Sequence, residues 1–385
     1  MTQTTTQDRP SLEELSQHFP HWQVLADLID QGVDLMLNLR QSGHPGGSRS
    51  KVPMLVTATL GAGMRFDIRQ PENPAGDRFV LVAGHANPAV YAMLAVYNEA
   101  LRLRHKQTGD DRFLVPNADN RQLVWEDLLQ LRHHGQLPGH AEMEGKTLFF
   151  KANTGPSGHG APAALGQAMA LKHSGSKAKV FALEGEGGHS AGAHHEVKNS
   201  AFGLGLDNLI YLLDWNDHGI DTFANSTVVH GGPEDWFKPY GWRVAGVEDG
   251  EDFEAMTRAL LEIVHADDTE GKPGCVWFKT RKGRGYYSYD APSHGKSHGR
   301  NSELFWRCRK DFADRYKVNF EGQDDTTDLG EEACRDQTRG WFKTVFSVLE
   351  NTPGLVEYLS DRLLEVAEGL PSTKPATGRD LAQEK

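Results

Sequence analysis

The sequence predicts an α/β fold in which a parallel sheet carries helices on both faces. Short apolar runs such as VFAL (180–183) and LIYLL (209–213) alternate with longer segments that have helical periodicity. The runs are apolar at consecutive positions rather than at every second one, which is typical of parallel strands buried on both faces. Strands that alternate with helices in this way indicate one sheet covered by crossover helices.

The first part of the chain is expected to contain two long helices, one strand and a third helix. Helical periodicity extends over residues 11–40 and 52–62, and the loop Ser42–Ser48 (SGHPGGS) separates the two segments. A strand within 77–86 runs into a Gly-His turn, and a helix follows over 88–103.

The middle of the chain continues the alternation after a break. Residues 104–122 are polar and aperiodic, which predicts an exposed insertion. Further helices are expected over Trp125–Gly135, within Asn153–His173 after a glycine-rich turn, over His194–Phe202 and over Phe253–Ala266. Further strands are expected over 179–185, over 208–216, within 236–248 and over Cys275–Thr280.

The character of the chain changes near residue 300. The acidic segment Glu321–Glu332 is nearly devoid of apolar residues and is expected to be a surface linker, followed by two more helical patterns. We therefore divide the chain into a cofactor-binding domain (1–300), a C-terminal helical extension (301–370) and a tail predicted to be disordered (371–385).

Composition excludes several classes of protein. The 385 residues include 41 Lys and Arg against 53 Asp and Glu, so the formal net charge of −12 disfavours nucleic acid and anionic membranes as partners. No apolar stretch is long enough to span a bilayer, and the N-terminal MTQTTTQDRP has no apolar signal core, which predicts a cytoplasmic protein. The three cysteines form no CxxC pair and are expected to be ordinary thiols.

Polar side chains at two strand ends predict a metal site. Glu186 follows the strand KVFALEG, and Asn216 ends the strand NLIYLLDWN. A right-handed crossover can place such strands side by side, so that both side chains meet beyond their carboxyl ends. Their oxygens suit Mg²⁺ or Ca²⁺, and Gly185 and Gly187 would let backbone N–H groups approach a diphosphate. Either residue alone would favour an ordinary turn, but the pair at this spacing, with a strand before each, favours the metal site.

Several motifs together resemble the transketolase superfamily of thiamine diphosphate enzymes. GEG followed by DWN resembles the cofactor motif of that family, which usually reads GDG with a distal Asn. SGHPGGS, DRFVLVAGH, LPGHAE, TGPSGHG and LDNLIYLLDWND resemble further family segments, and they occur in the family's order between about residues 20 and 300. The resemblance implies the thiamine diphosphate-binding fold.

The resemblance also implies roles for individual residues. The metal ligands would be Glu186, Asn216 and the carbonyl of His218. Residues around the cofactor would be His85, Gly155, Ser157, Gly185, Gly187 and Asn216. The catalytic histidines would be His44, His85, His140 and His298, with His294 as the alternative to His298. Four other histidines match no family histidine and are expected to be structural: His159, His189, His194 and His195.

The sequence departs from the family pattern in three respects. Glu186 replaces the usual Asp, and Ala191 stands where the family often has Glu. Ser157 and His159 replace Leu and Gln of the GPLGQG motif. Finally, a transketolase continues into a pyrimidine-binding domain and a C-terminal domain, for which this chain offers no candidate segment.

We therefore expect one subunit of a split transketolase of the pentose phosphate type, with thiamine diphosphate and Mg²⁺ (or Ca²⁺) as cofactors. It would transfer a two-carbon ketol unit between sugar phosphates. Its partner would be a pyrimidine-binding/C-terminal subunit in an α2β2 heterotetramer, with a homodimer of this chain as the alternative. The closing segment FKTRKGRGYY also resembles the pyruvate dehydrogenase E1 component. A 2-oxo acid dehydrogenase or decarboxylase subunit, or a non-catalytic cofactor-binding subunit, remains a competing hypothesis.

Overall fold

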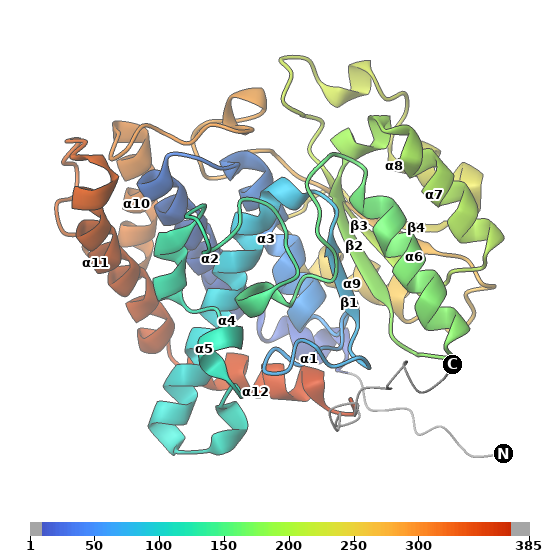
Figure 1. Ribbon diagram of the computed structural model, residues 1–385, viewed down its shortest axis with the longest axis horizontal. Helices are drawn as coiled ribbons and strands as arrows, with labels where there is room; N and C mark the ends of the chain where they lie inside the picture. Colours follow the sequence, from blue (N-terminus) through green and yellow to red (C-terminus); the bar gives the residue numbers. More distant parts are fainter. Residues whose placement is uncertain (1–9, 371–385) are drawn as a thin grey trace, which may run out of the picture.

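The computed structural model describes residues 10–370 and has a five-stranded parallel sheet at its centre (Figure 1). The strand order is β1-β2-β3-β5-β4, and every neighbouring pair is parallel. The strands are β1 (Arg78–Leu81), β2 (Val180–Gly185), β3 (Leu209–Trp215), β4 (Arg243–Val247) and β5 (Gly274–Lys279). The predicted α/β class is confirmed.

The sheet separates two hydrophobic cores because successive side chains of a strand point to opposite faces. On β2, Phe181 and Leu183 belong to the larger core, whereas Val180 and Ala182 belong to the smaller one. All four side chains are fully buried, which explains why the strand is apolar at consecutive positions.

Helices cover both faces, as Figure 1 shows. The larger core is built with α2 (Phe19–Arg40), α3 (Pro45–Leu60), α4 (Asn87–Thr108), α9 (Phe253–Val264), α10 (Glu303–Tyr316), α11 (Gly330–Asn351) and α12 (Leu355–Ala367). The smaller core is covered by α6 (Gly160–His173), α7 (Gly192–Gly203) and α8 (Pro233–Phe237). Two short helices complete the set: α1 (Leu12–Ser16) and α5 (Ala118–Arg121).

Local sequence signals account for several helix ends. Ser11 and Glu14 form a capping box at the start of α1, and Asp252 accepts hydrogen bonds from the first N–H groups of α9. The residues that follow α2 and α4, Gln41 and Gly109, are both in the left-handed conformation (φ 55° and 69°) that terminates helices.

Several predicted elements differ from the structure. The predicted loop Ser42–Ser48 is shorter, because α3 already begins at Pro45. The segment 104–122 is only partly an exposed insertion, because α4 continues to Thr108 and Phe113 is buried beside two arginines. The predicted helix Trp125–Gly135 is a 3-10 helix that stops at Gln130. It stops because Leu131 is extended and Arg132 has a φ of 58°.

The C-terminal helices share the larger core with the N-terminal ones. Tyr358 of α12 accepts a hydrogen bond from the Trp22 indole of α2 (2.6 Å), and Arg362 donates to the Leu60 carbonyl at the end of α3 (2.9 Å). Residues 321–329 are exposed, as predicted for the acidic linker. The predicted tail 371–385 lies outside the described residues.

Two smaller expectations concern cysteines and membranes. Cys275, Cys308 and Cys334 are free and buried, as expected for ordinary thiols. Within residues 10–370, no helix has the length and apolar character needed to cross a bilayer.

Candidate active site

Glu186 lies immediately beyond the carboxyl end of β2 and contacts the end of β3. Its side chain is 1% exposed. One carboxylate oxygen accepts a hydrogen bond from the N–H of Asn216 (3.1 Å), and the other accepts one from the side-chain amide of Asn225 (2.9 Å). Glu186 thus contacts Asn216 as predicted, but through the backbone N–H of Asn216 rather than through its side chain. Burial, followed by the nearby charge of Asp214, raises the pKa of Glu186.

The carboxamide of Asn216 is held at both of its ends. Its amide nitrogen donates to Oδ2 of Asp214 (2.9 Å), and its oxygen accepts from the N–H of His218 (3.1 Å). Asp217, which lies between Asn216 and His218 in the chain, has a φ of 64°, and this conformation turns the chain sharply after the strand. The oxygens expected to bind a metal therefore lie within one hydrogen-bonded group.

Lys282, which follows β5, contacts the same group and was not identified from the sequence. Its ammonium donates to the carbonyls of His218 (2.7 Å) and Gly219 (3.1 Å) and contacts Nδ1 of His294 (2.8 Å). Burial and the neighbouring Lys51 lower the pKa of Lys282 to about 8. The signal that could have indicated it is its position just beyond the carboxyl end of a buried strand.

Four histidine rings form a cluster beside this group. The ring centroid of His44 lies 4.9 Å from that of His85, 5.3 Å from that of His294 and 6.5 Å from that of His140. His85 and His294 are 5.4 Å apart. Three of the predicted histidines are thus brought together, and His294 completes the cluster.

His298, the preferred candidate from the sequence, lies outside this cluster. Its ring stacks on Tyr286 at 3.8 Å, and its Nε2 lies 3.2 Å from the Ser288 hydroxyl. The structure therefore places His294 where the spacing had favoured His298. The physical reason is the turn at Ala291–Ser293, which directs His294 toward Lys282.

Glycines allow the segments that carry the histidines to approach closely. A Cβ on Gly46 would lie 2.1 Å from the hydroxyl oxygen of Ser293, next to His294. A Cβ on Gly84 would lie 2.7 Å from the carbonyl of Thr154, next to His85. Side chains at either position would push the histidine-bearing loops apart.

All four histidines of the cluster have lowered pKa values, with burial as the main cause. The pKa of His44 falls to about 3, with further contributions from His294 and Arg132. The pKa of His294 falls to about 4 because of burial and Lys282. Burial also lowers the pKa values of His85 and His140, with Lys51 and Arg132 as the next causes. The rings are therefore neutral near pH 7 and can each donate and accept one hydrogen bond.

The remaining predicted cofactor residues lie around the same edge of the sheet. Gly155 is close to His140, since its Cβ position is 3.5 Å from the imidazole ring. The Cβ position of Gly187 lies 3.6 Å from the amide of Asn225, and that of Gly185 lies 3.7 Å from the ammonium of Lys51. Ser157 is exposed in the turn before α6.

The histidines expected to be structural divide into two groups. His159 and His195 are exposed. His189 and His194 are buried under the opposite face of the sheet, where their rings lie 3.9 Å apart and neither ring has a hydrogen-bond partner. They pack against Phe237 and belong to the smaller core rather than to the cluster.

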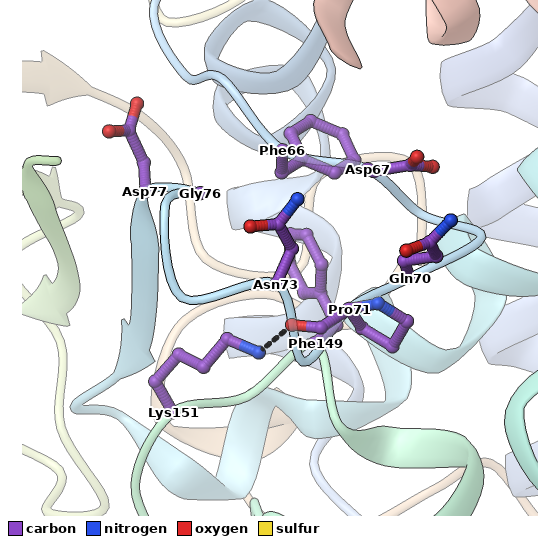
Figure 2. A pocket seen from close by; sticks show the side chains of 9 residues that line it. All are labelled: Phe66, Asp67, Gln70, Pro71, Asn73, Gly76, Asp77, Phe149 and Lys151. Atoms are coloured by element: carbon purple, nitrogen blue, oxygen red, sulfur yellow. Dashed lines mark hydrogen bonds between the residues drawn. The ribbon is translucent and has the colours of Figure 1, made fainter. Parts of the chain in front are cut away.

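A separate cavity near the amino end of β1 is too small for a substrate. Figure 2 shows it between Phe66, Asn73 and Lys151, whose ammonium donates to the carbonyl of Pro71. Its volume of about 10 Å³ has room for a single water molecule.

The donor atoms fit a hard divalent cation. A carboxylate, a carboxamide and a backbone carbonyl are the oxygen ligands that Mg²⁺ and Ca²⁺ prefer. The carbonyl of His218 already accepts from one cationic group, the ammonium of Lys282. Residues 10–370 contain no cluster of three or more His, Cys, Asp or Glu side chains arranged to hold a metal, so further ligands would have to come from water or a diphosphate.

A comparison with known protein families identifies the family to which this chain belongs. Residues 120–365 match the family described as "Transketolase, thiamine diphosphate binding domain". The chain belongs to the transketolase family. The match covers β2, β3 and β5, the three strands whose carboxyl ends carry the oxygen donors and Lys282.

The relatives of this transketolase-family chain are of two lengths. The transketolase of Halalkalibacterium halodurans is 32% identical over 263 residues, which are 63% of this chain but 34% of that protein. This chain thus spans about a third of the full-length transketolases that it matches. In contrast, the match covers 78% of the 6-deoxy-6-sulfo-D-fructose transketolase subunit SqwG of a Clostridium species (29% identity). It also covers 81% of one of the apulose-4-phosphate transketolase subunits of Actinobacillus succinogenes (29% identity).

Solved structures agree on the fold. Transketolase from Leishmania mexicana superimposes with a TM-score of 0.64 over 88% of this chain and 48% of that chain, at 22% sequence identity.

Proposed function

We propose that this chain is the thiamine diphosphate- and Mg²⁺-binding subunit of a split transketolase, which transfers a two-carbon ketol unit between sugar phosphates. The observation that carries the proposal is the contact between Glu186 and Asn216 at the ends of β2 and β3, beside four neutral histidines. The two relatives named as transketolase subunits support it, because the match covers most of their length.

The oxygens of Glu186, Asn216 and the His218 carbonyl would hold the metal. Lys282 would then turn from that carbonyl toward the diphosphate, whose charge its ammonium offsets. Gly187 has no side chain to shield the backbone from the same anion, whereas the N–H of Gly185 already donates to the carboxylate of Glu184 (3.0 Å). The cofactor supplies the carbanion chemistry that breaks and forms bonds between carbon atoms.

The histidine cluster would transfer protons to and from the substrate hydroxyls. Neutral imidazoles can accept a proton from a hydroxyl and return it to a developing oxyanion. Lys282 beside Nδ1 of His294 leaves Nε2 as the nitrogen available to substrate. We assign His44 and His294 to substrate oxygens, and His85 and His140 to the region of the thiazolium.

The metal assignment predicts that Glu186→Ala and Asn216→Ala abolish Mg²⁺-dependent binding of thiamine diphosphate. Each change removes a direct oxygen ligand and leaves the diphosphate charge poorly neutralised. Calorimetry with and without Mg²⁺ measures the effect, and His159→Ala, an exposed side chain, is the matched control. Undiminished affinity in both variants would eliminate the metal site.

The partner assignment predicts that this chain transfers no ketol unit alone and becomes active with a pyrimidine-binding transketolase subunit. Light scattering should then give the mass of two copies of each chain. The assay combines a ketose phosphate donor, an aldose acceptor, Mg²⁺ and thiamine diphosphate, with the assembled Asn216→Ala enzyme as the inactive control. Full activity of the single chain would refute the split-enzyme proposal.

A further inference from the structure

Lys51 is a buried lysine at the centre of the site. It lies on α3, two turns after His44, and only 2% of its surface is exposed. Its ammonium contacts Oδ2 of Asp214 (2.7 Å) and the Gly47 carbonyl (3.3 Å). It also lies next to Gly185, directly before Glu186. Burial of a lysine is energetically unfavourable, because the ammonium loses its hydration. The cost must be offset by pairing with an opposite charge and by hydrogen bonds.

The geometry of Asp214 does not depend on Lys51 alone. Its carboxylate also accepts hydrogen bonds from the Ser50 hydroxyl (2.6 Å), the Asn216 amide (2.9 Å) and the Thr280 hydroxyl. Three donors would therefore still orient the carboxylate, and through it the Asn216 amide, if the lysine were neutral. What Lys51 adds to this arrangement is a unit of positive charge.

That charge bears on what the site can bind. Two buried carboxylates, Glu186 and Asp214, both accept hydrogen bonds from Asn216 at the strand ends. Together they favour a divalent cation and repel an anionic diphosphate. Lys51 offsets one of these charges, and it does so from a fixed position because both its hydrogen bonds are inside the protein.

We propose that Lys51 is a fixed internal cation that sets the balance of the site between divalent cation and diphosphate, by neutralising Asp214. The inference rests on the proposed function, which places both ligands here. Removing the charge should strengthen binding of a metal ion alone and weaken binding of a diphosphate alone. A merely structural role for Lys51 would instead weaken both.

The test is a charge cycle on the full-length chain at pH 8. The variants are Lys51→Met, Asp214→Asn and the double variant, with thermal unfolding as the check on folding. Mn²⁺ alone and inorganic pyrophosphate with EDTA are titrated separately by calorimetry. A unit charge roughly 6–10 Å from a bound ion, at an effective dielectric constant of about 20, corresponds to about a 10- to 100-fold change in affinity for each unit of charge on the ion.

The expected signs are opposite for the two ligands. Lys51→Met should bind the divalent Mn²⁺ at least about 100-fold more tightly and pyrophosphate correspondingly more weakly. Asp214→Asn should show the reverse, which keeps the test decisive if Lys51→Met does not fold. The double variant, with both charges removed, should return close to the native affinities.

The outcomes separate this inference from the proposed function. If the native chain binds both probes but the single variants change both affinities in the same direction, or neither, the charge role of Lys51 is refuted while the cofactor site stands. If the native chain binds neither Mn²⁺ nor pyrophosphate, the proposed function is refuted, and the inference with it.

Discussion

Replacing Gly46 with alanine should separate the two loops that bring His44 and His294 together. Gly46 lies in the first turn of α3, two residues after His44. A Cβ there would lie 2.1 Å from the Ser293 hydroxyl oxygen, 2.8 Å from the Ser293 carbonyl and 2.9 Å from the Cγ of Lys282. The hydroxyl can rotate away, but the carbonyl belongs to the backbone and cannot.

The displacement can be estimated from these distances. Cβ atoms essentially never approach other heavy atoms closer than 3.0 Å, so the Ser293 backbone must retreat, and Lys282 with it. Insertion of a methyl group into a close contact destabilises a protein by about 1–3 kcal/mol. The carbonyl at 2.8 Å must retreat by a few tenths of an ångström, and since a misplacement of about 1 Å in an active site can lower turnover roughly 100-fold, this smaller shift should lower turnover by less. We expect both effects, because His294 directly follows the residue that moves.

Denaturant unfolding and turnover of the assembled enzyme measure the two effects. The matched control is Gly340→Ala in α11, where no atom lies within 4 Å of the added methyl group. That change should leave turnover unaltered and stabilise the protein by about 0.5–1 kcal/mol through helix propensity. Native turnover and stability in Gly46→Ala would refute the close approach of the two loops.

Two further predictions concern other histidines. His85→Ala and His140→Ala should lower turnover more than they lower the unfolding midpoint, as rates and melts in parallel would show; if both variants simply unfold, these residues serve the core. His189 and His194 are buried with lowered pKa values, that of His194 about 3, mainly because of burial. Protonation on unfolding should therefore remove stability as the pH falls from about 6.5 toward 3, by up to about 1.4 kcal/mol per pH unit for each ring. The double variant His189→Phe/His194→Leu should have a flatter stability profile over this range, and an unchanged profile would contradict the prediction.

The strand ends could be predicted because their signal is local. Apolar runs that stop at a carboxylate or an amide indicate both a buried strand and its functional end. Glu186 and Asn216 were therefore predicted to meet, and the carboxylate of Glu186 does contact Asn216, although at its backbone N–H. The GHPG, AGH and PGH segments placed three histidines correctly in one cluster, although only the resemblance to a family suggested it.

The choice between His294 and His298 could not be made from the sequence. Both residues lie in an aperiodic loop, where three-dimensional contacts decide the position of each ring. Tyr286 stacks on His298, while Gly46 leaves room for the segment that carries His294. Lys51 was missed for a similar reason, since its partner Asp214 lies at the end of a strand more than 160 residues later.

The segment Trp125–Gly135 was predicted as a helix because its leucines recur at helical spacing. In the structure the helix stops at Gln130, because Arg132 has a φ of 58° and its guanidinium donates to the Ser42 hydroxyl and the Gly139 carbonyl. Tertiary packing has overridden local periodicity here.

The hydrogen bonds between α12 and the first helices have a consequence for how the protein is made. Trp22 and Leu60 can bond their partners Tyr358 and Arg362 only after the chain as far as α12 has left the ribosome. Until then, the surfaces of α2 and α4 that α11 and α12 cover are open to solvent and to other nascent chains. The sheet can form earlier. The packing of helix α2, which leads directly to the loop carrying His44, is complete only when α11 is in place. The order of synthesis and the order of packing therefore diverge at the site, because residues translated well before α12 complete their packing only once α12 is present.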